Sequence, residues 1–177
     1  MKLYLGILIT IVGLSLSVTS YASDETYGDG VAAYSLQNYE KARNIWLKLA
    51  EEGHGPSIFR LADLYARGLG GPKDAAMAAK YYCQAAEGNH AEALYYCAKG
   101  KKESGAGGIE EYIKSADLGH RRAQYDLANF YVSGDGVEKD YQAAYLLYQS
   151  VYESNADDQL GKLASKMMLA LDAALKK

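Results

Sequence analysis

Residues 127–149 read LANFYVSGDGVEKDYQAAYLLYQ, and this stretch decides the fold. It begins with a helical pattern in which Leu127, Ala128 and Tyr131 recur at the spacing of one helix face. A glycine-rich segment, VSGDGVEKD, then interrupts the pattern before a second helical pattern begins at Tyr141. Because glycine allows the chain to turn tightly, we expect two antiparallel helices joined by a short turn.

The same unit recurs along the chain. LAEEGH ends at His54, AAEGNH at His90 and SADLGH at His120, so the first interval is six residues longer than the second. A fourth, less similar ending, VYESN, closes at Asn155, one residue before the position that the longer interval would give. Intervals of this length are the sequence signature of stacked helical repeats. The shorter interval predicts that the third repeat lacks six residues in the turn between its helices.

Matched positions define both helices of a repeat. In the second helix, small and aromatic residues share one face, and a residue that accepts the left-handed conformation follows the helix end. The small residues are Ala42, Ala78 and Ala144; the aromatic residues are Trp46, Tyr82, Tyr112 and Tyr148; the end residues are Gly53, Asn89, Gly119 and Asn155. In the first helix, Leu61 matches Leu127 and Tyr65 matches Tyr131.

From residue 30 to residue 155 the chain resembles the Sel-one-like repeats, relatives of the tetratricopeptide repeat. Their pattern places Ala-x-x-x-Leu-Gly-x-x-Tyr before Gly-x-Gly-Val-x-x-Asp and an Ala-rich helix that ends in Gly-His. The resemblance is strongest in the second and fourth repeats, where Ala62 and Ala128 stand in place of the usual Gly. It implies an all-α fold: an α-solenoid of about four helix-turn-helix repeats. Residues 156–175 would add a C-terminal capping helix, with Met167, Met168, Leu171 and Leu175 on its apolar side.

The N-terminal segment has the features of a signal peptide. Lys2 precedes an apolar run over residues 3–18, and Ser20 and Ala22 supply small residues at the −3 and −1 positions. We expect cleavage after Ala22, a mature domain over residues 23–177, and a location in the periplasm or outside the cell. A membrane anchor is the alternative, but the run is shorter than the roughly 20 residues that span a bilayer.

Composition excludes several function classes. Residues 1–22 contain one Lys and no acidic residue, so the mature chain has 18 basic and 22 acidic residues and a net charge of −4. No basic stripe for nucleic acid is present. The motifs of serine hydrolases and phosphate-binding loops are absent, and the three histidines are separated by helix pairs rather than spaced as metal ligands. We therefore expect no catalysis, no metal and no cofactor.

Two cysteines remain in the predicted mature chain, Cys83 and Cys97. They fall on the second helix of one repeat and the first helix of the next, which are antiparallel neighbours. Cysteine-rich relatives of the repeat family bridge the same kind of helix pair near Ala86 and Ala93, one helical turn away. In an oxidising compartment the two cysteines predict a disulfide, and two free buried thiols are the alternative.

The tetratricopeptide analogy places the first helices on the concave side of the solenoid. Two sets of matched residues would then face a groove, one aromatic and one polar. The aromatic set is Phe59, Tyr95 and Tyr125, and the polar set is Asp63, Lys99 and Asn129. Aromatic anchors beside polar groups are typical of protein interfaces, so we expect partner binding here. The alternative is that the aromatic rings only pack between adjacent repeats.

The resemblance and the exported context leave two function classes. The first is an adaptor or scaffold that binds other proteins. The second is an immunity or inhibitor protein that neutralises a secreted toxin or lytic enzyme, a role that several small exported proteins of this family hold. In both classes the partner is another protein, and neither nucleic acid nor, after cleavage, the membrane takes part.

Overall fold

The computed structural model describes residues 25–176, and the predicted signal peptide lies outside this range. The described residues form nine α-helices and no strand. Their bounds are α1 Tyr27–Ser35, α2 Tyr39–Glu51, α3 Gly55–Arg67, α4 Ala75–Ala86, α5 Ala91–Glu103, α6 Ile109–Asp117, α7 Arg121–Ser133, α8 Tyr141–Ser154 and α9 Gln159–Leu175. None of these helices is long and apolar enough to cross a membrane.

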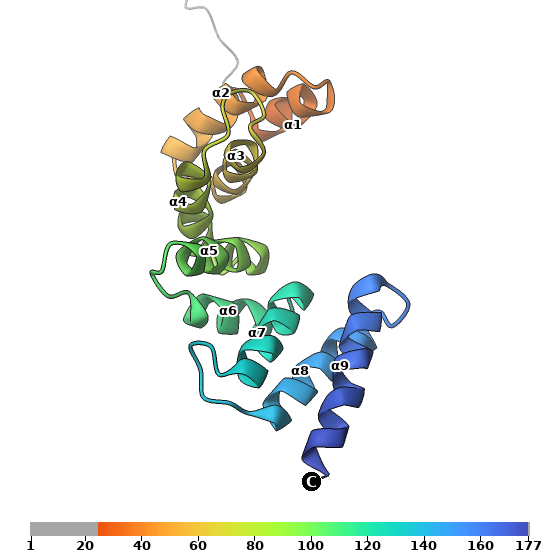
Figure 1. Cartoon of the computed structure of the whole chain (residues 1–177). Helices are drawn as coiled ribbons and strands as arrows, with labels where there is room; N and C mark the ends of the chain where they lie inside the picture. Colours follow the sequence, from red (N-terminus) through yellow and green to blue (C-terminus); the bar gives the residue numbers. More distant parts are fainter. Residues whose placement is uncertain (1–24, 177) are drawn as a thin grey trace, which may run out of the picture.

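The helices form four antiparallel pairs, α1–α2 to α7–α8, and α9 closes the series. Each helix packs mainly on the one before it and the one after it, with a smaller contact between α7 and α9. The pairs therefore follow one another along an arc, with α1 at one end and α9 at the other (Figure 1). The prediction of an all-α solenoid with four repeats and a capping helix is confirmed.

The three repeated histidines begin the first helices of repeats two to four. In each, Nδ1 of the imidazole accepts a hydrogen bond from the backbone N–H three residues on: from Ser57 to His54 at 3.3 Å, and from Ala93 to His90 and from Ala123 to His120 at 3.2 Å each. A helix N-terminus has backbone N–H groups without helical partners, and a side-chain acceptor there stabilises the helix. The histidines thus repeat because each repeat starts with the same cap.

The predicted left-handed residues after the second helices are confirmed in three repeats and wrong in the fourth. Gly53, Asn89 and Gly119 have φ of 83°, 56° and 81°. Asn155 instead is extended, with φ of −168°. The reason is the guanidinium of Arg121, which donates to the backbone oxygen of Asn155 at 3.1 Å and to Asp158, the N-cap of α9. The chain is extended at Asn155 and then bends over residues 156–158 before α9 begins.

The third repeat is shorter, but not only in its turn. The turn between α5 and α6 covers residues 104–108, two residues fewer than the turn over residues 68–74. The other four residues are missing from the second helix and its end. The start of α6 is four residues closer to His120 than the start of α4 is to His90. The expectation that all six were missing from the turn is wrong. Gly108, with φ of 112°, is the N-cap of α6, and a Cβ there would clash with the backbone oxygen of Ala98.

Candidate functional site

The predicted aromatic set occupies the fifth position after each cap histidine. Each ring contacts the aromatic ring of the following second helix: Phe59 lies 5.6 Å from Tyr82, Tyr95 lies 5.8 Å from Tyr112, and Tyr125 lies 5.4 Å from Tyr148, between ring centroids. Phe59 and Tyr95 also lie 4.8 Å from the cap histidine of the next repeat, His90 and His120. Phe59 and Tyr95 therefore join one repeat to the next, as in the packing alternative, whereas the ring contact of Tyr125 lies within its own repeat.

Tyr95 departs most from the expected groove. Its side chain is only 5% exposed, and its hydroxyl donates to Asp126 of α7 at 3.1 Å. Burial, and next the Asp126 carboxylate, raise the pKa of Tyr95. The expectation that this ring faces an open groove is wrong, because the next repeat covers it. Phe59 and Tyr125 are half-buried and keep part of their surface in solvent.

The predicted polar set does not form one continuous row. Asp63 pairs with Arg67 on the same helix at 3.2 Å, and Lys99 is exposed and lies 3.9 Å from Glu103. Asn129 is committed to the core: its Oδ1 accepts from the hydroxyl of Tyr148 at 2.7 Å and its Nδ2 donates to a backbone oxygen of its own helix. Asp63 and Lys99 thus pair with neighbours on their own helices, whereas Asn129 is bonded within the core.

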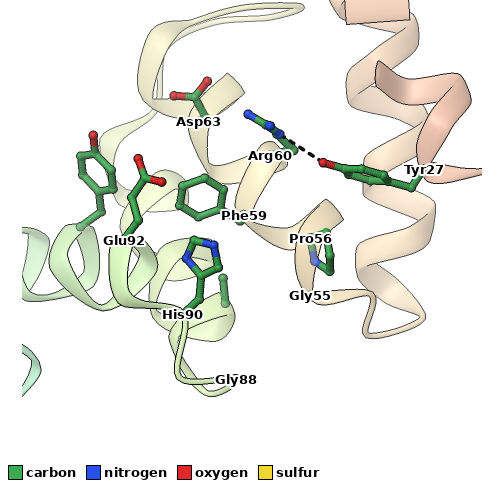
Figure 2. A pocket seen from close by; sticks show the side chains of 11 residues that line it. Tyr27, Gly55, Pro56, Phe59, Arg60, Asp63, Gly88, His90 and Glu92 are labelled. Carbon is green, nitrogen blue, oxygen red and sulfur yellow. Dashed lines mark hydrogen bonds between the residues drawn. The ribbon is translucent and has the colours of Figure 1, made fainter. Parts of the chain in front are cut away.

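The structure instead forms a hollow of about 420 Å³ between α3 and α5. It contains two of the predicted residues, Phe59 and Asp63 (Figure 2). Helix α5 adds Glu92 and Tyr96, and the turn before it adds His90. The remaining wall is supplied by Tyr27, Gly55, Pro56, Arg60, Ala85 and Gly88. The hollow is thus built from two successive first helices, α3 and α5, with α1 contributing only at its edge.

Sequence reasoning missed the α5 side of this hollow. It followed the fifth position of the first helix, where Tyr95 is buried, whereas the surface is formed by the second and sixth positions, Glu92 and Tyr96. These two residues lie four apart and share a helix face. A charged residue and an aromatic residue on the same outward face, unmatched in the other repeats, were the available signal.

Burial and two carboxylates act on the tyrosines at the hollow. Tyr82 packs on both Phe59 and Tyr96, and burial, then the carboxylate of Asp63 and more weakly that of Glu92, raise the pKa of its hydroxyl. The pKa of Tyr96 is raised in the same way, by burial and then by Glu92. Both acidic groups therefore act on the same aromatic cluster, although they come from different helices.

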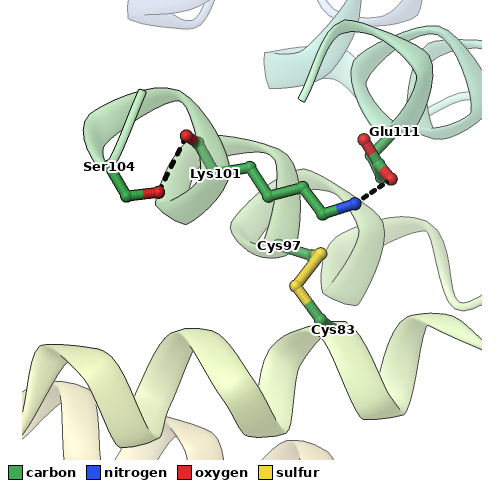
Figure 3. The surroundings of a disulfide bond; sticks show 5 residues. All are labelled: Cys83, Cys97, Lys101, Ser104 and Glu111. Atoms are coloured by element: carbon green, nitrogen blue, oxygen red, sulfur yellow. Dashed lines mark hydrogen bonds and ion pairs between the residues drawn. A yellow bond between two sulfur atoms is a disulfide. The ribbon is translucent and has the colours of Figure 1, made fainter. Parts of the chain in front are cut away.

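A disulfide holds the α5 side of the hollow in place. Cys83 of α4 and Cys97 of α5 are bonded, with their Cα atoms 4.6 Å apart (Figure 3). Cys97 is buried, with 2% of its surface exposed. One turn further along α5, Lys101 donates to Glu111 at 2.5 Å and so ties α5 to α6. The predicted disulfide is present, and it fixes the helix that carries Glu92 and Tyr96.

The titratable groups around the hollow come from α1, α3, α5 and the turn before α5. The titratable groups that line it include two carboxylates, an imidazole used as a helix cap and an arginine that donates to Tyr27 at 3.3 Å. Across residues 25–176, no three His, Cys, Asp or Glu side chains gather closely enough to hold a metal ion.

Comparison with known proteins agrees with this fold. The chain is similar to a chitin synthase regulator, SKT5, of Saccharomyces cerevisiae, with 26% identity over 161 residues, covering 82% of this chain and 22% of that protein. A Sel1 repeat protein from Oxalobacter formigenes superposes with a TM-score of 0.66 and 25% identity, over 72% of this chain and 55% of that one.

A second solved structure is c5321, a protective antigen of uropathogenic Escherichia coli strains with the same repeat fold. Its TM-score is 0.68 at 23% identity, over 85% of this chain and 38% of that one. This chain spans about a fifth of the yeast relative and about half or less of the two bacterial chains.

The family model of the Sel1 repeat matches residues 21–54, 55–90 and 121–154. The unmatched interval contains the third repeat, which has lost a helical turn. Proteins of this family generally bind other proteins and typically have no catalytic role. The matched residues cover more than half of the sequence, and the chain therefore belongs to the Sel1 repeat family.

Proposed function

We propose that this protein is exported and binds a partner protein through the hollow between α3 and α5. The observation that carries the proposal is the hollow itself, in which two partly exposed aromatic rings, Phe59 and Tyr96, stand beside carboxylates on a helical scaffold. Aromatic side chains in a concavity with polar neighbours are the usual anchors of protein interfaces. Lys99, exposed one turn beyond Tyr96, lines a neighbouring hollow that also includes Tyr96.

Export is supported by two independent features. The sequence begins with the pattern of a signal peptide, and the disulfide is of a kind that persists in oxidising compartments. An exported binding module serves either as an adaptor or as an inhibitor of a secreted toxin or lytic enzyme. The identity of the captured partner separates these two classes.

The test is to block the hollow without disturbing the helices. Gly88 lines the hollow, its φ lies outside the left-handed region, and a Cβ there would meet only a backbone oxygen at 3.7 Å. Gly88→Trp therefore adds a large side chain at the wall of the hollow while leaving the backbone relaxed. Gln142→Trp, at an exposed position on α8, is the matched control. Both variants are checked by thermal melting.

Immobilised protein is then used to capture partners from the periplasmic or secreted fraction of the source cells, with mass spectrometry as the readout. We expect a partner that the wild type and Gln142→Trp retain and that Gly88→Trp loses. Equal capture by all three proteins would show that binding, if any, uses another surface and would reject the proposal.

A further inference from the structure

The hollow contains an acidic group, Glu92, that makes no ion pair within 4.0 Å with the other residues that the structure describes. Glu92 is exposed in the first turn of α5. Asp63, by contrast, is paired with Arg67, which also donates to the hydroxyl of Tyr34 at 2.6 Å. The negative charge open to a ligand is therefore centred on Glu92.

Aromatic surface adjoins this carboxylate. In Figure 2 the Glu92 carboxylate lies beside the ring of Phe59, and the ring of His90 also lies against Phe59. Tyr96, one turn along α5 from Glu92, also lines the hollow and stacks on Tyr82 at 4.7 Å between centroids. A cation near aromatic faces is stabilised by the ring quadrupole, and a carboxylate adds a direct ion pair.

The arginine in the wall is directed elsewhere. Arg60 donates from Nε to the hydroxyl of Tyr27, on the α1 side of the hollow, at 3.3 Å. Figure 2 shows it on the side of Phe59 opposite Glu92. Its charge therefore balances Asp63 more than Glu92, as its raised pKa, due to Tyr27 and in part to Asp63, indicates.

We propose that the hollow receives a Lys or Arg side chain from an extended segment of the partner protein. The charged end lies at Glu92, and the aliphatic stem lies against Phe59 and Tyr96. A volume of about 420 Å³ accommodates a long side chain with adjoining backbone. This inference rests on the proposed function, because it specifies what the same hollow recognises.

The chain offers a built-in probe for the test. It contains two phenylalanines, Phe59 in the hollow and Phe130 on α7, so fluorine-labelled phenylalanine gives two assignable NMR signals. Phe130 lies against Lys102, 4.7 Å from its ring centroid, and serves as the internal control. The labelled protein, expressed from the full chain, is titrated with the peptide acetyl-Gly-Gly-Arg-Gly-Gly-amide. Matched peptides carry citrulline, which is neutral and of the same shape, or Glu in place of Arg.

We expect the arginine peptide to shift the Phe59 signal and not the Phe130 signal, with an affinity in the millimolar range. The affinity for the citrulline peptide should be at least about fivefold lower. An ion pair and a cation–π contact each contribute up to about fivefold in affinity at an exposed site. Glu92→Gln should weaken the arginine peptide by a similar factor. Glu153→Gln, on the exposed surface of α8, should leave it unchanged.

Equal affinities for arginine and citrulline, a preference for the Glu peptide, or an unmoved Phe59 signal at ~20 mM peptide would each overturn the inference. An unchanged affinity in Glu92→Gln would do the same. These failures differ from failure of the proposed function, because a partner whose capture is lost in Gly88→Trp but unaffected by Glu92→Gln would still use the hollow.

Discussion

Breaking the disulfide tests how far one covalent link stabilises this solenoid. Cys83 and Cys97 are 14 residues apart in sequence, so the bond closes a loop of about 15 residues. The loop-entropy relation gives about 3 kcal/mol for a loop of that size. For a domain of this length, such a loss corresponds to a fall in melting temperature of about 6–12 °C.

Reducing the wild-type protein is the cleanest perturbation, because it removes the bond and keeps every heavy atom. Oxidised and reduced samples are unfolded in urea and followed by far-ultraviolet circular dichroism. Cys83→Ala/Cys97→Ala is the control, and its unfolding midpoint should not respond to reductant. Alkylation without reductant, followed by mass spectrometry, should find neither cysteine alkylated in protein taken from its native compartment, because both sulfur atoms are in the disulfide. A loss below ~1 kcal/mol on reduction, or two free thiols in native protein, would refute the reasoning.

Three further measurements test the packing. Tyr95→Ala should lower the free energy of unfolding by about 3–5 kcal/mol, because the ring is only 5% exposed. The control Lys99→Ala should change it by less than about 0.5 kcal/mol. An equally small effect of Tyr95→Ala would place Tyr95 on the surface. Tyr148→Phe should cost about 0.5–1.5 kcal/mol in denaturant unfolding, since it removes the 2.7 Å bond to Asn129, and a neutral result would mean that the bond contributes nothing. Burial lowers the pKa of His120 below its usual 6.5, so folding favours the neutral ring. The stability that the neutral ring contributes is therefore present above about pH 6.5 and is lost as the pH falls through the lower pKa of the folded state. His120→Asn keeps a capping oxygen that does not titrate, so urea midpoints should fall less between pH 7 and pH 5 in the variant, and parallel curves would contradict this.

Much of the fold could be predicted because it is encoded locally and repeatedly. The helix pairs, the left-handed Gly53 and Asn89, and the disulfide follow from patterns that recur in successive repeats or from the position of two cysteines. Asn155 could not be predicted from its own identity, because its extended backbone is held by Arg121 at the start of α7, a whole helix pair earlier in the chain. Likewise the spacing of the repeats shows that the third is shorter, but it does not reveal that α6 begins only after Gly108.

The candidate site was only half predictable for the same reason. Phe59 and Asp63 were identified because they share a face of one helix, and both line the hollow. Tyr95 matches Phe59 in register, but the next repeat covers it through His120 and Asp126. A repeat pattern predicts which positions are equivalent within each unit. It does not show how closely the following unit approaches, and that distance decides whether an aromatic side chain is core or surface.

The nearest-neighbour packing of the helices has a consequence for how the molecule opens. Since each helix packs mainly on the helices next to it in the chain, the terminal repeats can unfold while the remaining repeats stay folded. The covalent bond between α4 and α5 lies near the middle of the series. Fraying that starts at α1 or at α9 therefore meets a crosslink before it can cross the whole molecule. The hollow adjoins that crosslink only through α4 and α5, so fraying from α1 would open its α3 side first and leave Glu92 and Tyr96 in place.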